Sequence, residues 1–244
     1  MEFHPADASQ QVARRVARRQ PACPHWQLLG PPIGRTLARP AREPWTSDDL
    51  RTRFIRWRRA GVCDRIMDSL AAAHDTAAQI IDTPVVRVHQ HAASIGGNWE
   101  QQVGRSRGGL TSKAHSAVDA NGLPMRVGLA PGEAHDNRLC RVLLAGLRPQ
   151  TMVLADRGCD AGWIMGLVDR RGARADIPPK RNRRNPTCFC PNLYRVRNLV
   201  ERFFDKTKQC RRIATRYDKL AAAFLAFIEF ASIRLWLRVY ESTP

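Results

Sequence analysis

The hydrophobic pattern of the chain becomes regular only after about residue 45. Residues 1–45 are rich in Arg, Pro, Ala and Gln and carry no sustained period, which indicates a loosely ordered segment. Apolar side chains then recur at near-helical spacing behind the capping candidates of residues 46–49. The pattern predicts one helix that ends near Gly61 and a second helix over residues 63–76.

The next part of the chain is strand-like. Residues 80–88 form a short β-branched run, which predicts a buried strand that contains one acid, Asp82. Asn121-Gly122 separates two further runs, residues 112–119 and 125–130. This dipeptide predicts a hairpin with a type I′ turn.

Helix-like and strand-like runs alternate in the second half of the chain. A continuous apolar run over residues 151–155 ends at Asp156, as expected of an interior strand. A short strand is predicted over residues 173–177. One helix is predicted after Asp136, which can cap it. Further helices are predicted over residues 161–169, 192–213 and 219–237. This order of elements favours an α/β fold with a mixed sheet flanked by helices.

Basic residues greatly outnumber acidic ones. The 244 residues include 40 Lys and Arg against 22 Asp and Glu, which gives a formal net charge of +18. That charge favours a nucleic-acid partner but indicates no chemistry, since a ribosomal or chromatin-like binder would share it. The seven cysteines are scattered without a CxxC pair, and the chain has no long apolar run and no signal-peptide pattern. We therefore expect a reduced, cytoplasmic protein with no membrane partner.

Two acids interrupt the strand-like runs, where an unpaired carboxylate would be costly to bury. These acids are Asp82 and Asp156, and a salt bridge to one of the many arginines would satisfy either of them. If the two strands are neighbours and a helix that carries Glu201 packs over them, the three carboxylates converge. Carboxylate oxygens are ligands for hard cations such as Mg²⁺, and two such ions can support phosphodiester chemistry.

A polar stripe follows one side of the helix predicted over residues 192–213. Tyr194, Arg197, Glu201 and Lys208 fall within roughly 60° of one another on the helical wheel. Apolar side chains form a second stripe that can be buried. The alternative interpretation is a solvated face with i,i+4 pairs, such as Arg197 with Glu201.

The polar stripe carries a known signature. Residues 194–208 match the pattern Y-x2-R-x3-E-x6-K of insertion-sequence four and five transposases at all four positions, and residues 81–93 resemble the first-aspartate segment of that family. Other blocks resemble the family in the same order, at residues 104–115, 132–136, 155–160, 177–183 and 212–219. Between residues 50 and 238 the chain therefore resembles DDE transposases of the insertion-sequence five type.

The resemblance implies a ribonuclease H-like catalytic domain over residues 80–240. Asp82, Asp156 and Glu201 would be the catalytic residues and would bind Mg²⁺ or Mn²⁺. The implied partner is double-stranded DNA, both the insertion-sequence ends and the target, bound by a homodimer at the bacterial nucleoid. The residues expected to contact DNA are Tyr194, Arg197 and Lys208 at the cleaved end, and Arg105, Arg107, Lys113, Lys180, Arg181 and Arg183 along the backbone, unless these last six are solvated charges.

The chain departs from the family pattern at two places. Family members carry a helix-turn-helix-like region before the catalytic domain, which residues 1–45 do not resemble, so we expect residues 46–79 to be a helical remnant of a truncated region. Pro84 removes a hydrogen-bond donor close to Asp82. The sequence thus leaves three functions open: an active transposase, a truncated remnant that only binds DNA, and a nuclease that cuts without joining.

Several other polar residues have more ordinary interpretations. A zinc site from His89, His91, His115 and His135 is less favoured than hydrogen bonds to DNA or to the acids. Asp119, Asp136 and Asp160 are expected to be turn or cap residues.

Overall fold

The computed structural model describes residues 46–72, 77–93 and 100–241, so the expectation for residues 1–45 lies outside the described residues. The chain divides into two compact units, Met1–Val62 and Cys63–Pro244. In the first unit, helix α2 (Ser47–Arg59) begins at the predicted cap. The Thr46 hydroxyl accepts from the Asp49 backbone N–H at 3.2 Å, and the Asp49 carboxylate accepts from the Thr46 N–H at 3.2 Å.

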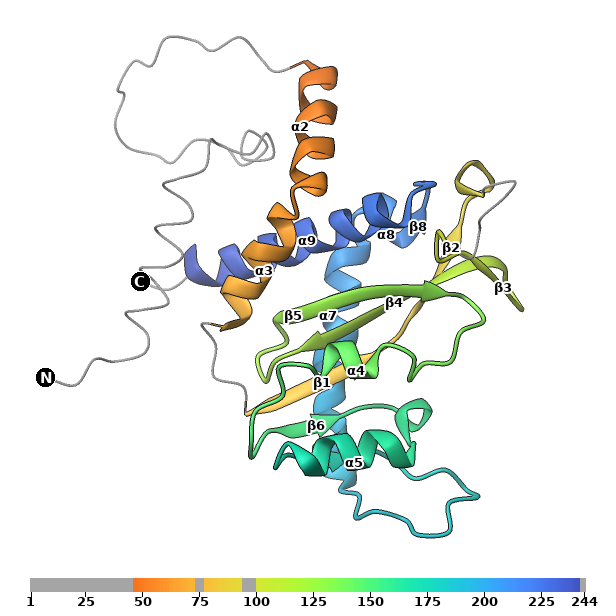
Figure 1. Ribbon diagram of the computed structural model, residues 1–244, viewed down its shortest axis with the longest axis vertical. Coiled ribbons are helices and arrows are strands. Elements are labelled where there is room, and N and C mark those ends of the chain that lie inside the picture. The colour runs from red at the N-terminus through yellow and green to blue at the C-terminus, as the bar shows by residue number, and fades with distance from the viewer. Residues whose placement is uncertain (1–45, 73–76, 94–99, 242–244) are drawn as a thin grey trace, which may run out of the picture. The chain divides into compact units, whose positions relative to one another are not determined.

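The second unit is built on a mixed sheet, which has eight strands among the described residues (Figure 1). Its longest strand, β4 (Gly109–Val118), has partners on both edges. On one edge β4 pairs antiparallel with β1 (Ala78–Asp82) and β2 (Val85–Val88), and on the other with β3 (Gly104–Ser106) and β5 (Pro124–Pro131). The parallel pairs are β1 with β6 (Met152–Leu154), β6 with β7 (Arg174–Asp176), and β2 with β8 (Thr215–Arg216).

The order of these strands confirms the predicted fold class. Strands β5, β4 and β1 form an antiparallel trio, and β6 and β7 extend it in parallel from β1. The single strand predicted over residues 80–88 is present as β1 and β2, which share the partner β4 and are interrupted at Thr83 and Pro84. This is the ribonuclease H-like mixed sheet flanked by helices.

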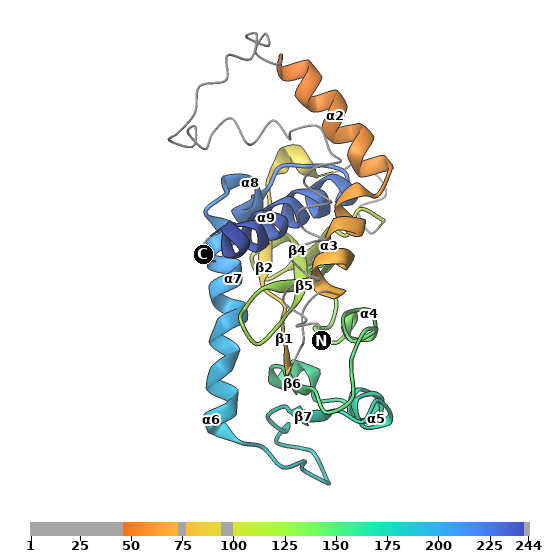
Figure 2. The same cartoon turned by 90° about the vertical axis from the view of Figure 1, so that its left-hand side faces the viewer.

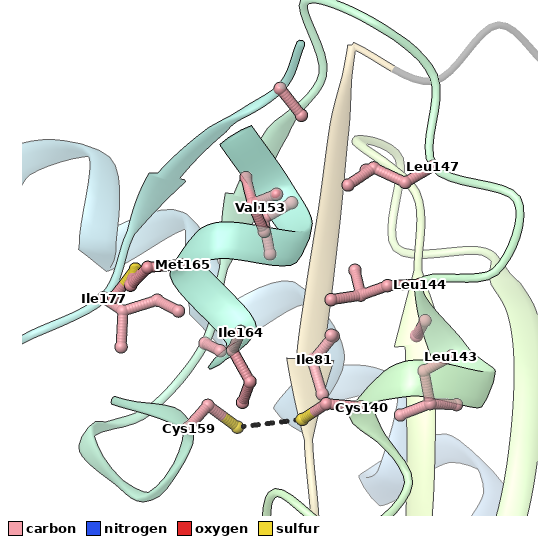
Figure 3. Close-up of a cluster of buried hydrophobic side chains, with 14 residues drawn as sticks. Ile81, Cys140, Leu143, Leu144, Leu147, Val153, Cys159, Ile164, Met165 and Ile177 are labelled. Carbon is pink, nitrogen blue, oxygen red and sulfur yellow. Dashed lines mark hydrogen bonds between the residues drawn. The ribbon is translucent and has the colours of Figure 1, made fainter. Parts of the chain in front are cut away.

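Helices cover both faces of the sheet. Successive side chains of β1 point to opposite faces, so apolar residues of this strand pack on both sides. Ile81 packs with α4 (Cys140–Leu143) and α5 (Gly162–Arg170) in a cluster drawn in Figure 3. Within it the sulfurs of Cys140 and Cys159 lie 3.5 Å apart. Ile80 packs on the opposite face, against α7 (Asn198–Lys208), α8 (Arg211–Ala214) and α9 (Ala221–Glu241), and Figure 2 shows α7 and α5 on opposite sides of β6.

The helices near the carboxyl end differ from the prediction at their boundaries. The helix expected over residues 192–213 begins one residue earlier, as α6 (Pro191–Tyr194), tightens into a 3-10 turn (Arg195–Arg197), and continues as α7. It ends at Lys208, and α8 is a separate short helix. Helix α3 (Val62–Ala72) packs through Met67 and Leu70 onto the buried Trp236 of α9.

The turn of the β4–β5 hairpin is wider than predicted. A type I′ turn needs positive φ at both central residues, but Gly122 alone has it, at +76°. The Asp119 carboxylate instead accepts hydrogen bonds from the backbone N–H groups of Asn121 (2.9 Å) and Leu123 (2.8 Å). The side chain of Asp119 therefore organises a five-residue connection, in agreement with its predicted role as a turn residue.

Pro84 lies where its missing donor is tolerated. It sits between β1 and β2, and its carbonyl still accepts a hydrogen bond from the Ala114 N–H at 3.1 Å. The parallel partner also changes here, because β1 pairs with β6 before the proline and β2 pairs with β8 after it. The interruption of the strand accommodates the proline, so the ladder around Asp82 is kept.

In the part of the chain that the structure describes, none of the helices is both long and apolar enough to cross a membrane.

Candidate active site

Asp82 is the last residue of β1, and Asp156 comes two residues after the end of β6, the parallel neighbour of β1. Ile80 of β1 is opposite Leu154 of β6, and each acid follows two residues later along its strand direction. Parallel neighbours are about 4.8 Å apart. Ile80 and Leu154 both pack against the α7 side of the sheet, and strand alternation gives Asp82 the same face as Ile80. The strand pairing therefore places both acids at the same end of the β1–β6 pair, and their role as joint metal ligands stays a prediction.

Glu201 reaches the same face from α7. The helix buries Val200, Phe203 and Phe204 against the sheet and packs on β1 and β4, which leaves the Glu201 side chain on its outer edge at 51% exposure. Val200, Phe203 and Phe204 of the apolar stripe are thus buried as predicted, whereas Val196 is exposed. Of the polar stripe Glu201 is exposed, and Tyr194, Arg197 and Lys208 are half-buried.

Arg197 connects two of the three acids. Its Nη1 donates to Asp82 Oδ1 at 2.8 Å, and its Nη2 donates to Glu201 Oε1 at 2.6 Å. The side chains of Arg197 and Asp82 are 17% and 20% exposed. Both alternatives that the sequence left open, an arginine partner for a strand acid and an i,i+4 pair on the helix, are therefore found in one residue.

The charge of Arg197 is matched by its surroundings. Burial alone would lower the pKa of its guanidinium, but the nearby charges of Asp82, Tyr194 and Glu201 raise that pKa above its ordinary value. The Arg197 guanidinium carbon also lies 5.6 Å from the centre of the Tyr194 ring. The stripe residues Tyr194, Arg197 and Glu201 are thus brought together, while Lys208 lies two turns further along at the end of α7.

The donor set fits a hard cation, although its arrangement does not yet gather three ligands. Asp82 and Glu201 already share one cationic group, and Asp156 follows the end of β6, which pairs with the strand that carries Asp82. Within residues 46–72, 77–93 and 100–241, no group of three His, Cys, Asp or Glu side chains is close enough together to hold a metal ion. Carboxylate oxygens are the ligands that Mg²⁺ and Mn²⁺ prefer.

A fourth carboxylate that sequence reasoning did not place lies beside Asp156. A Cβ atom added at Gly158 would be 2.9 Å from Asp136 Oδ2 and 3.0 Å from Asp156 Oδ1, so both carboxylates border that glycine. Lys113 of β4 donates to Asp136 Oδ1 at 2.7 Å and to the Ala134 carbonyl at 2.6 Å. Asp136 therefore pairs with a lysine and does not cap a helix as predicted, because the N-cap residue of α4 is Leu139 and makes no side-chain cap hydrogen bond.

His115 is buried one residue from the β4 position that pairs with Asp82. Its Nδ1 lies 3.0 Å from the Thr83 hydroxyl, and its Nε2 has no hydrogen-bond partner. Burial lowers the pKa of His115 to about 4, against the opposing charge of Asp136. This histidine is neutral at pH 7 and contacts a neighbour of Asp82 in sequence.

The predicted DNA-contacting residues fall into two groups. Arg105 and Arg107 are exposed on the β3–β4 hairpin, and Arg181 is exposed on the loop between β7 and α6. Lys113 and Arg183 are held in ion pairs, with Asp136 and Asp160 respectively. Asp160 also accepts from the Lys180 backbone N–H at 2.7 Å, which ties this basic loop to the segment just after Asp156.

The chain matches known proteins over most of its length. The family model described as Transposase DDE domain matches residues 73–236. A candidate transposase for insertion sequence element IS6501 from Brucella ovis is 36% identical over 130 residues, which is 53% of this chain and 100% of that protein. The residues matched by the family model include Asp82, Asp156 and Glu201.

Two solved structures are similar at a lower level. A cryo-electron-microscopy structure of a piggyBac transposase synaptic complex with hairpin DNA shares 10% identity over 81% of this chain, with a TM-score of 0.42. The chain spans 56% of that piggyBac chain, about half of its length. A Mos1 transposase paired-end complex with the left transposon end shares 11% identity over 98% of this chain and 78% of the other, with a TM-score of 0.29. Both TM-scores are too low to support a statement about function.

Proposed function

The chain belongs to the family of proteins with a transposase DDE domain, and on that premise we propose that it cleaves DNA at the ends of an insertion sequence and joins those ends to target DNA. One observation supports this reaction most strongly. Asp82 ends β1, Asp156 follows the end of the parallel neighbour β6 by two residues, and Arg197 joins Glu201 of α7 to Asp82. Three carboxylates arranged in this way could bind the metal ions of phosphodiester chemistry. A structural salt bridge would need only one of them.

In the proposed reaction, Asp82, Asp156 and Glu201 would hold Mg²⁺ or Mn²⁺. When bound, the ions would activate water or a 3′-hydroxyl group and stabilise the leaving oxygen. The role of the protein groups around them is to hold the DNA. Arg197 and Tyr194 lie beside Glu201, so the guanidinium and the phenol would contact the phosphates next to the reacting bond, with Lys208 further along.

The exposed basic residues would contact the DNA backbone on either side of the site. The exposed Arg105, Arg107 and Arg181 and the half-buried Lys180 are the first candidates, and the net charge of +18 would steer the polyanion toward them. Lys113 and Arg183 would join this set by exchanging their carboxylate partners for phosphates. We propose that the protein acts on nucleoid DNA in the bacterial cytoplasm, as a homodimer that holds two ends.

The test is cleavage of a DNA that carries the cognate ends. We expect wild-type protein with Mg²⁺ to release 3′-hydroxyl ends, and Asp156→Asn to lose at least about a hundredfold in rate, since a metal ligand accounts for several kcal/mol of transition-state stabilisation. Asp169→Asn, an exposed acid on α5, is the matched control and should cleave at the wild-type rate. Cleavage that needs no metal, or that Asp156→Asn retains, would contradict the proposal.

A DNA-binding remnant without catalysis is the second candidate, because Arg197 occupies two of the three acids. It predicts salt-sensitive DNA binding in wild type and Asp156→Asn alike, with no cleavage by either protein at any Mg²⁺ concentration. Filter binding across a range of salt concentrations, run beside the cleavage assay, separates the two functions.

A further inference from the structure

Arg197 neutralises two carboxylates through two different nitrogens of one rigid group. The guanidinium is planar, so the positions of Nη1 and Nη2 fix the separation and orientation of Asp82 Oδ1 and Glu201 Oε1. These acids are 119 positions apart in the chain, on a strand and on a helix that covers it. The arginine is therefore a positioning residue for the pair in the protein without bound metal.

The two carboxylates that Arg197 binds are two of the three proposed metal ligands. A cation and a guanidinium cannot both occupy the space between the same pair of carboxylate oxygens, and like charges so close repel each other. Arg197 also has an alternative partner, because the same group would contact phosphate in the proposed DNA complex.

From this geometry we infer that Arg197 is an exchangeable internal counter-ion: it holds Asp82 and Glu201 together until a divalent cation replaces it, and the released guanidinium then binds a DNA phosphate. The inference rests on the proposed function for the identity of the metal ligands. Among the described residues no three ligand side chains are gathered in the present arrangement, and Asp156 would complete the ligand set only after the exchange.

Loss of Arg197 should change two properties in opposite directions. Without metal, Asp82 and Glu201 would repel each other and the protein would unfold at a lower temperature. With metal, the competing cation would be gone and binding would become tighter. A residue with a purely structural role would lower both the stability and the metal affinity, so the two measurements together identify the exchange.

The experiment compares wild type, Arg197→Gln, Arg197→Lys and Arg202→Gln in the full chain, without DNA. Arg202 is exposed on the same helix, so its variant controls for the loss of one positive charge. Isothermal titration with Mn²⁺ should show about tenfold tighter binding for Arg197→Gln, equivalent to about 1.4 kcal/mol, and less than about twofold change for Arg202→Gln. Thermal unfolding in chelator should show a lower Tm for Arg197→Gln than for wild type and Arg202→Gln.

The Arg197→Lys variant distinguishes the effect of the two-pronged contact with Asp82 and Glu201 from the effect of the positive charge. A single ammonium keeps the charge but cannot reproduce the two-pronged contact, so Arg197→Lys should bind Mn²⁺ between wild type and Arg197→Gln. Wild-type affinity in Arg197→Lys, equal or weaker affinity in Arg197→Gln, or no Mn²⁺ binding by any of the four proteins would overturn the inference. The proposed transposition reaction is tested separately by cleavage, so tighter Mn²⁺ binding in a protein that never cleaves would leave the exchange intact and remove only that function.

Discussion

Glu229 of α9 provides a quantitative test of the packing between α9 and α3. Its side chain is 6% exposed and faces Asp64 and Asp68 of α3. Burial raises the pKa of Glu229 to about 8 from 4.5, with further contributions from the hydrogen bond to Asp64 and from the charges of both aspartates. The folded protein therefore keeps a proton on Glu229 that the unfolded chain releases.

The sign of the pH effect follows from this raised pKa. The stability associated with Glu229 is fully present below pH 4.5 and is lost as the pH rises toward 8, because the unfolded state ionises first. At roughly 1.4 kcal/mol per pH unit, the loss between pH 4.5 and pH 7 is about 3 kcal/mol. Glu229→Gln, which keeps the shape and a donor for Asp64, should be more stable than wild type by about 1–3 kcal/mol at pH 7.

Urea unfolding at several pH values between 4.5 and 8 measures this difference. The gap between Glu229→Gln and wild type should widen as the pH rises and level off near pH 8. Glu241→Gln changes an exposed glutamate at the end of the same helix and should follow wild type throughout. Parallel stability curves for wild type and Glu229→Gln would refute the assignment of a protonated, buried Glu229.

Three further changes test other parts of the fold and the site. Arg216 is buried with hydrogen bonds to three carbonyls and a hydroxyl, so Arg216→Met should lower the free energy of unfolding in urea by about 2–4 kcal/mol. Burial lowers the pKa of His115 to about 4, so the stability it contributes is lost as pH falls from 6.5 toward 4, and His115→Gln should flatten that part of the unfolding profile. A methyl group at Gly158 would lie 2.9 Å and 3.0 Å from two carboxylate oxygens, so Gly158→Ala should weaken Mn²⁺ binding measured by titration, whereas Gly162→Ala, which enters open space, should not.

Local patterns predicted the elements of the fold because each depends on nearby residues. The capping box at Thr46 and the alternation of Ile80 and Ile81 in β1 are set within a few positions. The predicted type I′ turn was wrong, because the Asp119 carboxylate accepts hydrogen bonds from backbone N–H groups within the turn, those of Asn121 and Leu123. The helix predicted over residues 192–213 was too long: α7 ends at Lys208, and the apolar spacing continues into the separate helix α8.

The candidate site was less accessible to sequence reasoning, since its contacts join distant segments. The bond between Arg197 and Asp82 spans 115 positions, and nothing in the basic composition distinguishes this arginine from the others. The same holds for Arg216, which is buried although it lies among exposed basic residues. Asp136 was expected to cap a helix, and its pairing with Lys113 and its position beside Asp156 depend on the β4 register and on Gly158.

The central claim is that Asp82, Asp156 and Glu201 act as one catalytic set. The most direct measurement is single-turnover release of 3′-hydroxyl ends from labelled DNA that carries the insertion-sequence ends, with wild type and with Asp82→Asn, Asp156→Asn and Glu201→Gln at matched DNA occupancy. We predict Mg²⁺-dependent release by wild type and a loss of at least about a hundredfold in each variant. Release at the wild-type rate by any one of the three variants would contradict the account.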